Sequence, residues 1–344
     1  MSRQLRILVT GGAGFIGSHY VRRLVGGAYP AFAGAAVVVL DKLTYAGTEA
    51  ALAPVADDER LRLVVGDICD ADLLDDLLPG TDVVVHFAAE SHVDRSITGA
   101  AEFVRTNVEG THTLLRACRD ARVGRFVQVS TDEVYGSITK GSWREDQPLD
   151  PSSPYSASKA SADLLALAYH RTYGLPVCVT RCSNNYGPYQ FPEKMIPLFV
   201  TNLLDGATVP LYGSGRNIRE WLHVDDHCRG VQLVAEGGRP GSVYHVGGGT
   251  ELTNRELTSL LLRELGADWQ DAVRPAPDRP GHDLRYSIDD TRIRTELGYR
   301  PRIDLCTGLA DTVRWYAENR SWWEPLKART AAAGAAAAAT REAS

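Results

Sequence analysis

The sequence predicts an α/β fold, in which a doubly wound parallel Rossmann sheet is accompanied by a smaller mixed α/β subdomain. Three observations lead to this fold class. A glycine-rich turn follows the first apolar segment, short apolar segments then alternate with helical patterns, and the chain becomes polar and rich in Pro and Gly after Arg181. Short apolar strands that alternate with helices are typical of parallel sheets covered on both faces.

Short apolar segments alternate with helical patterns along most of the chain. The predicted strands of the large sheet are 6–10, 35–41, 61–67, 82–88, 125–130 and 175–180. The predicted helices are 18–24, 71–78, 101–121 and 155–173, and a further helix at 222–236 precedes a strand at 242–246. The segment 182–192 is expected to be a loop.

The chain is therefore expected to leave its first domain and return to it. The first domain comprises 1–181 plus about 221–248, and the second about 182–220 and 249–326. The alanine-rich segment 327–344 is expected to be a disordered tail.

Composition and charge restrict the classes of function. The chain has 344 residues, enough for two domains, and a net charge of -6, which argues against nucleic acid or a membrane surface as partner. No apolar run approaches the ~20 residues of a spanning helix. The N-terminus runs almost at once into a strand, so no signal peptide and a cytoplasmic location are expected. The six cysteines form no CxxC pair, so neither a disulfide framework nor a metal site is expected.

The glycine-rich turn predicts a dinucleotide site. Gly11-Gly12-Ala13-Gly14-Phe15-Ile16-Gly17 follows a strand and opens a helix, so its backbone can touch a pyrophosphate that faces the helix N-terminus. The plain alternative, a glycine turn without a ligand, fits this strand–turn–helix context less well. The predicted cofactor residues of this half of the chain are Gly11, Gly14, Phe15, Ile16, Gly17, Asp41, Lys42, Leu43, Thr44, Asp67, Ile68, Phe87, Ala88 and Ala89.

Asp41 indicates which dinucleotide is bound. It ends the second strand, 27 residues after Gly14, so the first crossover is expected to carry a longer loop. A carboxylate at this place accepts hydrogen bonds from ribose hydroxyls and repels a 2′-phosphate, which favours NAD over NADP. The alternative is a solvated aspartate at a strand end.

A tyrosine and a lysine predict an oxidation. Tyr155 and Lys159 lie one turn apart on the helix that begins after Ser153 and Pro154. A tyrosine with a pKa near ~10 is a poor base at neutral pH unless a cation stabilises its phenolate, which Lys159 can do while it also holds the nicotinamide ribose. Thr131, at the end of the fifth strand, can bind the same substrate hydroxyl. A lone Y-x-x-x-K recurs by chance, but here it follows a dinucleotide turn and a Ser-Thr strand end.

With these residues in place, the chain resembles the extended short-chain dehydrogenase/reductases that act on nucleotide sugars, and more narrowly the dTDP-glucose 4,6-dehydratase family. The resemblance extends from about residue 6 to 320. Its matching segments are 41–47, 88–96, 130–136, 184–194, 219–224 and 279–282. It implies that C4 of the sugar is oxidised, that water is lost across C5 and C6, and that the hydride returns to C6.

The pair Asp132-Glu133 distinguishes this elimination from related reactions. Loss of water needs a base at C5 and an acid at the C6 hydroxyl, which two carboxyls in different protonation states supply. The resemblance implies that Glu133 is the base and Asp132 the acid. An epimerase has no use for the pair, and the plain alternative is a solvated loop dipeptide.

Matching positions imply the remaining contacts. Ser91, Thr106 and Asn185, together with Tyr155 and Lys159, are expected to contact the cofactor. The expected substrate residues are Ser91, Thr131, Asn184, Lys194, Pro210, Tyr212, Arg219, Asn254, Arg279, His282 and Tyr286. A pyrophosphate favours bidentate arginines, although each arginine alone would suggest a surface salt bridge.

The superfamily resemblance also implies a homodimer formed through the helices at 101–121 and 155–173. Two alternatives stay open at this point. One is a nucleotide-sugar epimerase or decarboxylase of the same fold, and the other is a non-catalytic dinucleotide-binding regulator.

Overall fold

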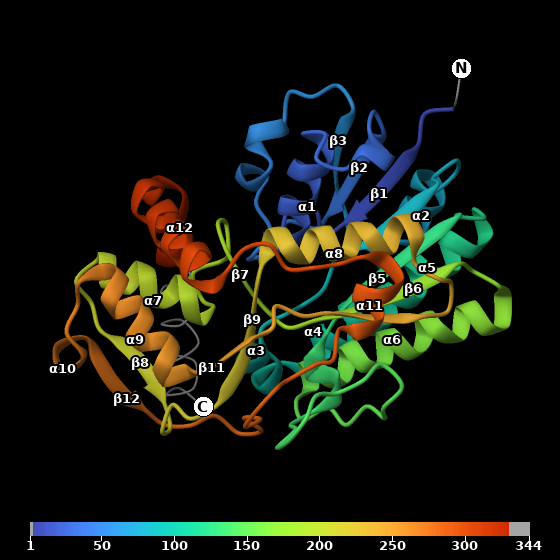
Figure 1. The fold of residues 1–344 in the computed structure, drawn as a ribbon. Helices are drawn as coiled ribbons and strands as arrows, with labels where there is room; N and C mark the ends of the chain where they lie inside the picture. Colours follow the sequence, from blue (N-terminus) through green and yellow to red (C-terminus); the bar gives the residue numbers. More distant parts are fainter. Residues whose placement is uncertain (1–2, 330–344) are drawn as a thin grey trace, which may run out of the picture.

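A seven-stranded parallel sheet forms the centre of the larger unit (Figure 1). The computed structural model describes residues 3–329. The strands lie in the order β10-β6-β5-β4-β1-β2-β3. Their bounds are β1 Arg6–Thr10, β2 Ala36–Asp41, β3 Leu61–Val65, β4 Val83–His86, β5 Arg125–Thr131, β6 Val177–Cys182 and β10 Val243–Val246. The predicted doubly wound sheet is confirmed, and its order reverses between β1 and β4, where open α/β sheets bind ligands.

Successive side chains of β1 face opposite layers of helices. Ile7 and Val9 belong to the core beneath α1 (Phe15–Val25) and α8 (Val224–Gly237), and Leu8 belongs to the core on the other face. That second face is covered by α2 (Ala71–Leu77), α5 (Thr111–Asp120) and α6 (Pro154–Tyr173). Continuous apolar strands result because both faces of the sheet are buried.

A smaller lobe, at the left in Figure 1, packs beside the carboxyl ends of the large sheet. It contains a three-stranded sheet in the order β11-β9-β7 and the parallel pair β12-β8. The strands are β7 Asn184–Tyr186, β8 Val209–Tyr212, β9 Ile218–His223, β11 Thr250–Thr253 and β12 Val273–Ala276. The helices α7 (Met195–Leu204), α9 (Asn254–Leu265), α10 (Trp269–Ala272) and α12 (Leu305–Glu318) complete it, and residues from α7, α9 and α12 share one apolar core.

Two segments differ from what the sequence predicts. The helix α8 and the strand β10 belong to the large sheet and its covering layer, and α11 (Thr291–Leu297), which lies within the segment 249–326 placed by sequence in the second domain, packs against both. The segment 182–192, expected to be a loop, contains β7, which pairs with β9. Strand β7 is only three residues long, so its pairing partner rather than its own sequence makes it a strand.

The predicted helix at 101–121 is interrupted. Helix α4 (Ala100–Phe103), which follows α3 (Val93–Thr98), passes into a π-helical segment at Val104–Gly110 before α5 begins. Asn107, inside that segment, donates to Ser158 Oγ at 2.8 Å and to the Glu90 carbonyl at 3.0 Å. The π turn therefore lies where the helix is fastened to its neighbours, as such turns often do near functional sites.

The predicted helix at 222–236 begins two residues later than expected. Leu222 and His223 end strand β9, and the His223 imidazole accepts a hydrogen bond from the Asp225 backbone N–H at 3.2 Å, which caps α8. A side-chain cap of this kind fixes the start of a helix more firmly than helix propensity does.

The C-terminal part of the described chain packs against the smaller lobe. Residues 327–329 are helical and Lys327 pairs with Asp205 at 2.6 Å, while the rest of the predicted tail, 330–344, lies outside the described residues. Within 3–329, no helix has both the length and the apolar character needed to cross a membrane.

Candidate active site

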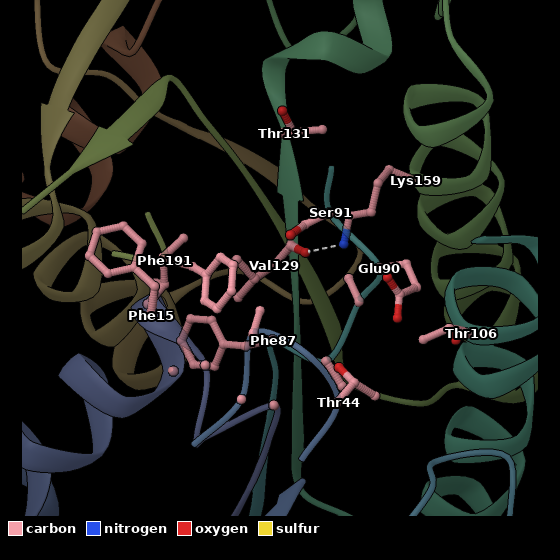
Figure 2. Close-up of a pocket in the computed structure, with 18 of the residues that line it drawn as sticks. Phe15, Thr44, Phe87, Glu90, Ser91, Thr106, Val129, Thr131, Lys159 and Phe191 are labelled. Atoms are coloured by element: carbon pink, nitrogen blue, oxygen red, sulfur yellow. Dashed lines mark hydrogen bonds between the residues drawn. The ribbon is translucent and has the colours of Figure 1, made fainter. Parts of the chain in front are cut away.

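Two adjoining cavities open where the large sheet meets the smaller lobe. The larger has a volume of about 360 Å³ and lies at the ends of β1, β2, β4 and β5 (Figure 2). The smaller has about 180 Å³ and is enclosed mainly by residues of the smaller lobe. Glu133, Asn184, Glu193 and Lys194 line both cavities, so the two form one site with two compartments.

The structure gathers the sequence-predicted residues around these compartments. Around the larger cavity lie Gly11, Gly14, Phe15, Ile16, Gly17, Asp41, Lys42, Thr44, Asp67, Ile68, Phe87, Ala88, Ala89, Ser91, Thr106, Thr131, Asp132, Glu133, Tyr155, Lys159, Asn184, Asn185 and Lys194. Around the smaller lie Glu133, Asn184, Lys194, Pro210, Tyr212, Arg219, Asn254, Arg279, His282 and Tyr286. Leu43 lines neither, because its side chain packs against the core beneath α1 and its backbone N–H donates to Asp41.

The glycines of the first turn serve different purposes. A Cβ on Gly11, whose φ is +68°, would lie 2.5 Å from the Ala88 nitrogen, and one on Gly17 would lie 2.2 Å from the Gly11 carbonyl oxygen. A Cβ on Gly14 would meet nothing nearer than that oxygen at 3.4 Å, an ordinary contact. Gly11 and Gly17 are therefore required by the protein's own packing. Gly14, which caps α1, lines the larger cavity and has space for a Cβ.

Asp41 is held rigidly at the end of β2. Its two carboxylate oxygens accept backbone N–H groups from Ala13 and Leu43, each at 2.9 Å. A carboxylate has about four lone-pair sites, so acceptor capacity is left for ribose hydroxyls. A Cβ on Gly47 would lie 2.8 Å from Asp41 Oδ1, so Gly47 lets the following loop fold closely over this carboxylate.

Helix α6 presents Tyr155 and Lys159 to the larger cavity. It begins with a reciprocal cap, in which Ser153 Oγ accepts from the Ser156 backbone N–H at 3.1 Å and Ser156 Oγ accepts from the Ser153 N–H at 3.0 Å. Lys159 Nζ donates to the Val129 carbonyl at 2.7 Å, which is the dashed line in Figure 2. Burial raises the pKa of Tyr155 well above its usual value and lowers the pKa of Lys159.

The end of strand β5 and the turn after it carry three functional groups in a row. Thr131 ends the strand, and its Oγ1 accepts from the Glu133 N–H at 3.3 Å and lies 3.3 Å from Asp132 Oδ1 as a donor. Asp132 is 2% exposed, and its Oδ2 has no hydrogen-bond partner among the described residues. This unsatisfied oxygen is costly to bury as a charge, which favours the protonated carboxyl.

The two neighbouring carboxyls have opposite electrostatic surroundings. Burial raises the pKa of Asp132 well above its usual value, and the negative charges of Glu133 and Glu220 raise it further. Burial also raises the pKa of Glu133, but Arg279, Arg219 and Lys194 oppose that rise. Surroundings that differ in this way allow two neighbouring carboxyls to take different protonation states.

Three cations converge on the smaller cavity. Arg219 is 5% exposed, stacks over the Tyr286 ring at 4.2 Å and donates to the Asp283 carbonyl at 3.0 Å. Arg279 pairs with Asp94 at 3.3 Å, and its Nε has no partner among residues 3–329. With Lys194, these groups offer several N–H donors to an anionic ligand such as a diphosphate.

A contact that the sequence reasoning missed joins the two lobes over the cofactor compartment. The Tyr45 ring meets Phe191 edge-on at 5.4 Å, and the Arg95 guanidinium lies 3.5 Å from the centre of the Tyr45 ring. Arg95 also pairs with Glu193 at 3.4 Å. Glu90, Phe191 and Glu193 line the larger cavity. They lie inside or beside the segments that carry the family resemblance, which is the signal that could have identified them.

Comparison with known proteins agrees with this geometry. The family model described as GDP-mannose 4,6 dehydratase matches residues 8–312. The dTDP-glucose 4,6-dehydratase of Streptomyces niveus is 62% identical over 330 residues, covering 96% of this chain and 98% of that protein. The one from Streptomyces antibioticus is 63% identical over 331 residues, covering 95% and 97%.

A solved structure is also similar to this chain in sequence and in fold. The crystal structure of DesIV, a dTDP-glucose 4,6-dehydratase from Streptomyces venezuelae with NAD bound, has 67% sequence identity and a TM-score of 0.93, and the match covers 94% of this chain and 100% of that one. The similarity therefore extends over both lobes and both compartments of the site. By sequence and by fold, the chain belongs to the GDP-mannose 4,6 dehydratase family and, within it, to the dTDP-glucose 4,6-dehydratases.

Proposed function

We propose that the protein is an NAD-dependent lyase that removes water from dTDP-glucose to give dTDP-4-keto-6-deoxyglucose. One observation carries the proposal: Glu133 lines both compartments, directly after Thr131 and the buried Asp132. An acid and a base are thus held together at the junction of a dinucleotide compartment and a cation-rich compartment. That arrangement suits an elimination and has no role in a simple epimerisation.

The residues around the larger cavity fit NAD. Gly14 lines the cavity and has space for a Cβ, the N-terminus of α1 follows it, and the Asp41 carboxylate keeps acceptor capacity. These groups would hold the pyrophosphate and the adenosine ribose, and Lys159 with Tyr155 would hold the nicotinamide half. The bound cofactor would take a hydride from C4 of the sugar and return it to C6.

The chain's own side chains account for the proton transfers. Tyr155 takes the proton of the C4 hydroxyl, which Thr131 orients, and Lys159 stabilises the phenolate. The C4 ketone acidifies the C5 proton, which Glu133 removes. Asp132 donates its proton to the C6 hydroxyl, which leaves as water, and Glu133 returns its proton to C5 when C6 is reduced. Arg219, Arg279 and Lys194 hold the diphosphate, since they are the cations of the smaller compartment.

Incubation with dTDP-glucose tests this function. We expect a 4-keto-6-deoxy product without net consumption of NAD. Glu133→Gln should reduce bound cofactor normally but slow elimination by about 10²- to 10⁴-fold, the usual contribution of a general base, so that reduced cofactor accumulates. Glu318→Gln, at an exposed glutamate that ends α12 and lines neither cavity, is the control and should behave as wild type.

Two outcomes would overturn the assignments. Stoichiometric release of reduced cofactor, or a simple C4 epimer as product, would exclude the dehydratase and favour a dehydrogenase or an epimerase. Normal turnover by Glu133→Gln would remove Glu133 as the base.

We further propose a homodimer formed through α4, α5 and α6. Val104 in the π-helical segment and Leu164 on α6 are 55% and 58% exposed, and α6 packs against that segment. Exposed apolar side chains gathered on neighbouring helices are typical of an interaction surface. The cytoplasmic location and the division of the chain into two domains stay predictions from the sequence.

A further inference from the structure

A buried arginine–carboxylate pair lies behind the active site, one helical turn from the buried Lys159. Lys159 is 5% exposed, Arg181 on β6 is 3% exposed, and Asp163 is 0% exposed. Arg181 Nε donates to Asp163 Oδ2 at 2.8 Å. Asp163 follows Lys159 by one turn of α6, so the two side chains lie on the same face of that helix. Asp163 Oδ1 has no hydrogen-bond partner among the described residues.

The end of the Arg181 guanidinium that does not bind Asp163 contacts a chain of neutral groups. Its Nη1 donates to the Tyr135 hydroxyl at 2.5 Å, and Tyr135 donates to His245 Nε2 at 2.7 Å. His245 Nδ1 in turn donates to the Asp289 carbonyl at 2.9 Å. Burial lowers the pKa of His245 to about 3, so this imidazole is neutral. The charge of Arg181 is therefore balanced by Asp163.

Lys159 has no other anion facing it within residues 3–329. Its ammonium donates to the neutral Val129 carbonyl, as Figure 2 shows. The other titratable groups around it are Tyr155 one turn earlier on α6 and Cys182 on β6, whose pKa values are raised by burial, and His86 on β4, whose pKa is lowered to about 3 by burial. All three are uncharged at neutral pH. Burial works against the Lys159 charge and Asp163 works for it.

The polar groups around Asp163 come from several elements. Arg181 comes from β6, Lys159 from its own helix, the Ser130 hydroxyl from β5 and Tyr135 from the turn after β5. Removing its charge would leave the buried Arg181 without its ion-pair partner and would remove the negative charge that favours the buried Lys159 ammonium, both of which are expensive in a low-dielectric interior. Lys159 can escape that cost by losing its proton, whereas an arginine cannot.

We infer that Asp163 is a positioning residue for the oxidation step, which keeps Lys159 charged so that Lys159 can stabilise the Tyr155 phenolate. The inference rests on the proposed function, in which Tyr155 is the base at C4. Asp163 itself touches neither cavity. Its effect passes entirely through Lys159.

Direct titration of Lys159 tests the inference without the reaction. The chain has few lysines, so ¹³C-labelled lysine NMR with Lys159→Met for assignment can follow this one ammonium. In Asp163→Asn, the titration midpoint of Lys159 should fall by about one to three pH units, the usual effect of losing a close opposite charge. The amide keeps an oxygen for Arg181, so the shape of the site is preserved.

A second readout is the rate at which bound cofactor is reduced by dTDP-glucose. In Asp163→Asn, this rate should fall about tenfold or more at neutral pH and recover as the pH rises, because Tyr155 then needs a higher pH to ionise. Asp226→Asn is the matched control, since Asp226 is 1% exposed and pairs with Arg229 at 2.7 Å. It should leave the Lys159 midpoint and the shape of the pH profile unchanged.

A double variant keeps the test decisive if Asp163→Asn fails to fold. Asp163→Asn with Arg181→Met removes the stranded arginine charge together with the carboxylate, and Lys159 should still titrate at lower pH. An unchanged midpoint in these variants, or a loss of rate that is the same at every pH, would overturn the inference. A wild-type protein that never reduces its cofactor with dTDP-glucose would instead overturn the proposed function, and the titration would still decide about Asp163.

Discussion

A methyl group added at Gly14 should weaken cofactor binding while the protein stays folded. Gly14 has φ −79° and ψ 177°, which alanine adopts readily, and the nearest atom to an added Cβ is the Gly11 carbonyl oxygen at 3.4 Å. Gly14→Ala should therefore change the free energy of unfolding of the cofactor-free protein by less than about 1 kcal/mol, because the lower entropy of the unfolded chain and the poorer N-cap act in opposite directions.

The same methyl group occupies space where the pyrophosphate is expected. Losing one charge-assisted hydrogen bond to a backbone N–H costs about 1.5–3 kcal/mol. The dissociation constant for NAD should therefore rise about tenfold to a hundredfold. Calorimetric titration of the cofactor-free protein measures this constant, and urea unfolding measures the stability.

Gly17→Ala provides the contrast, because its Cβ would lie 2.2 Å from the Gly11 carbonyl oxygen and 2.9 Å from Gly12 Cα. Those are backbone atoms, so the turn itself must move, and the free energy of unfolding should fall by about 1–3 kcal/mol. The reasoning would be refuted if Gly14→Ala bound NAD as tightly as wild type. It would also be refuted if Gly14→Ala, rather than Gly17→Ala, lost stability.

Two further predictions concern stability and assembly. Burial lowers the pKa of His86 to about 3 from 6.5, so the unfolded chain binds more protons between these values and stability is lost as the pH falls through that window. His86→Gln should reduce the slope of unfolding free energy against pH there by about 1.4 kcal/mol per pH unit, and an equal slope in both proteins would contradict this. Leu164→Glu should convert the proposed dimer to monomer in light scattering, whereas Leu284→Glu, on a residue that is 52% exposed and distant in sequence from those helices, should not. A wild-type monomer, or a dimer that survives Leu164→Glu, would exclude the proposed interface.

Local patterns were sufficient for the large sheet. The alternation at Ile7, Leu8 and Val9 follows directly from a strand with helices on both faces, and the structure sends these side chains into two separate cores. The glycine turn and the Y-x-x-x-K pair are also local, because a few neighbouring residues fix their backbone geometry. By contrast, the break between α4 and α5 depends on Asn107 reaching Glu90 and Ser158, contacts that no sequence window contains.

The candidate site was only partly accessible from the sequence. Arg219 and Arg279 could be nominated by resemblance, but their convergence on one compartment depends on the fold of the smaller lobe. The contact between Tyr45, Arg95 and Glu193 joins residues far apart in the chain. Leu43 was predicted with its neighbours to contact the cofactor, but its side chain packs against the core. Its backbone N–H donates a hydrogen bond to Asp41.

The sequence by itself determined which chemical groups the protein has and in what order. Thr131, Asp132, Glu133, Tyr155 and Lys159 could be read as an oxidising set and an eliminating pair, because each motif is short and its residues are neighbours. Only the tertiary structure decided how those groups differ in protonation and which further residues govern them. Burial and charges from distant segments act differently on Asp132 and Glu133, and the packing of α6 on β6 pairs Asp163 with Arg181 one helical turn from Lys159. Such effects depend on distances through space and on exclusion of water, which are properties of the folded chain alone.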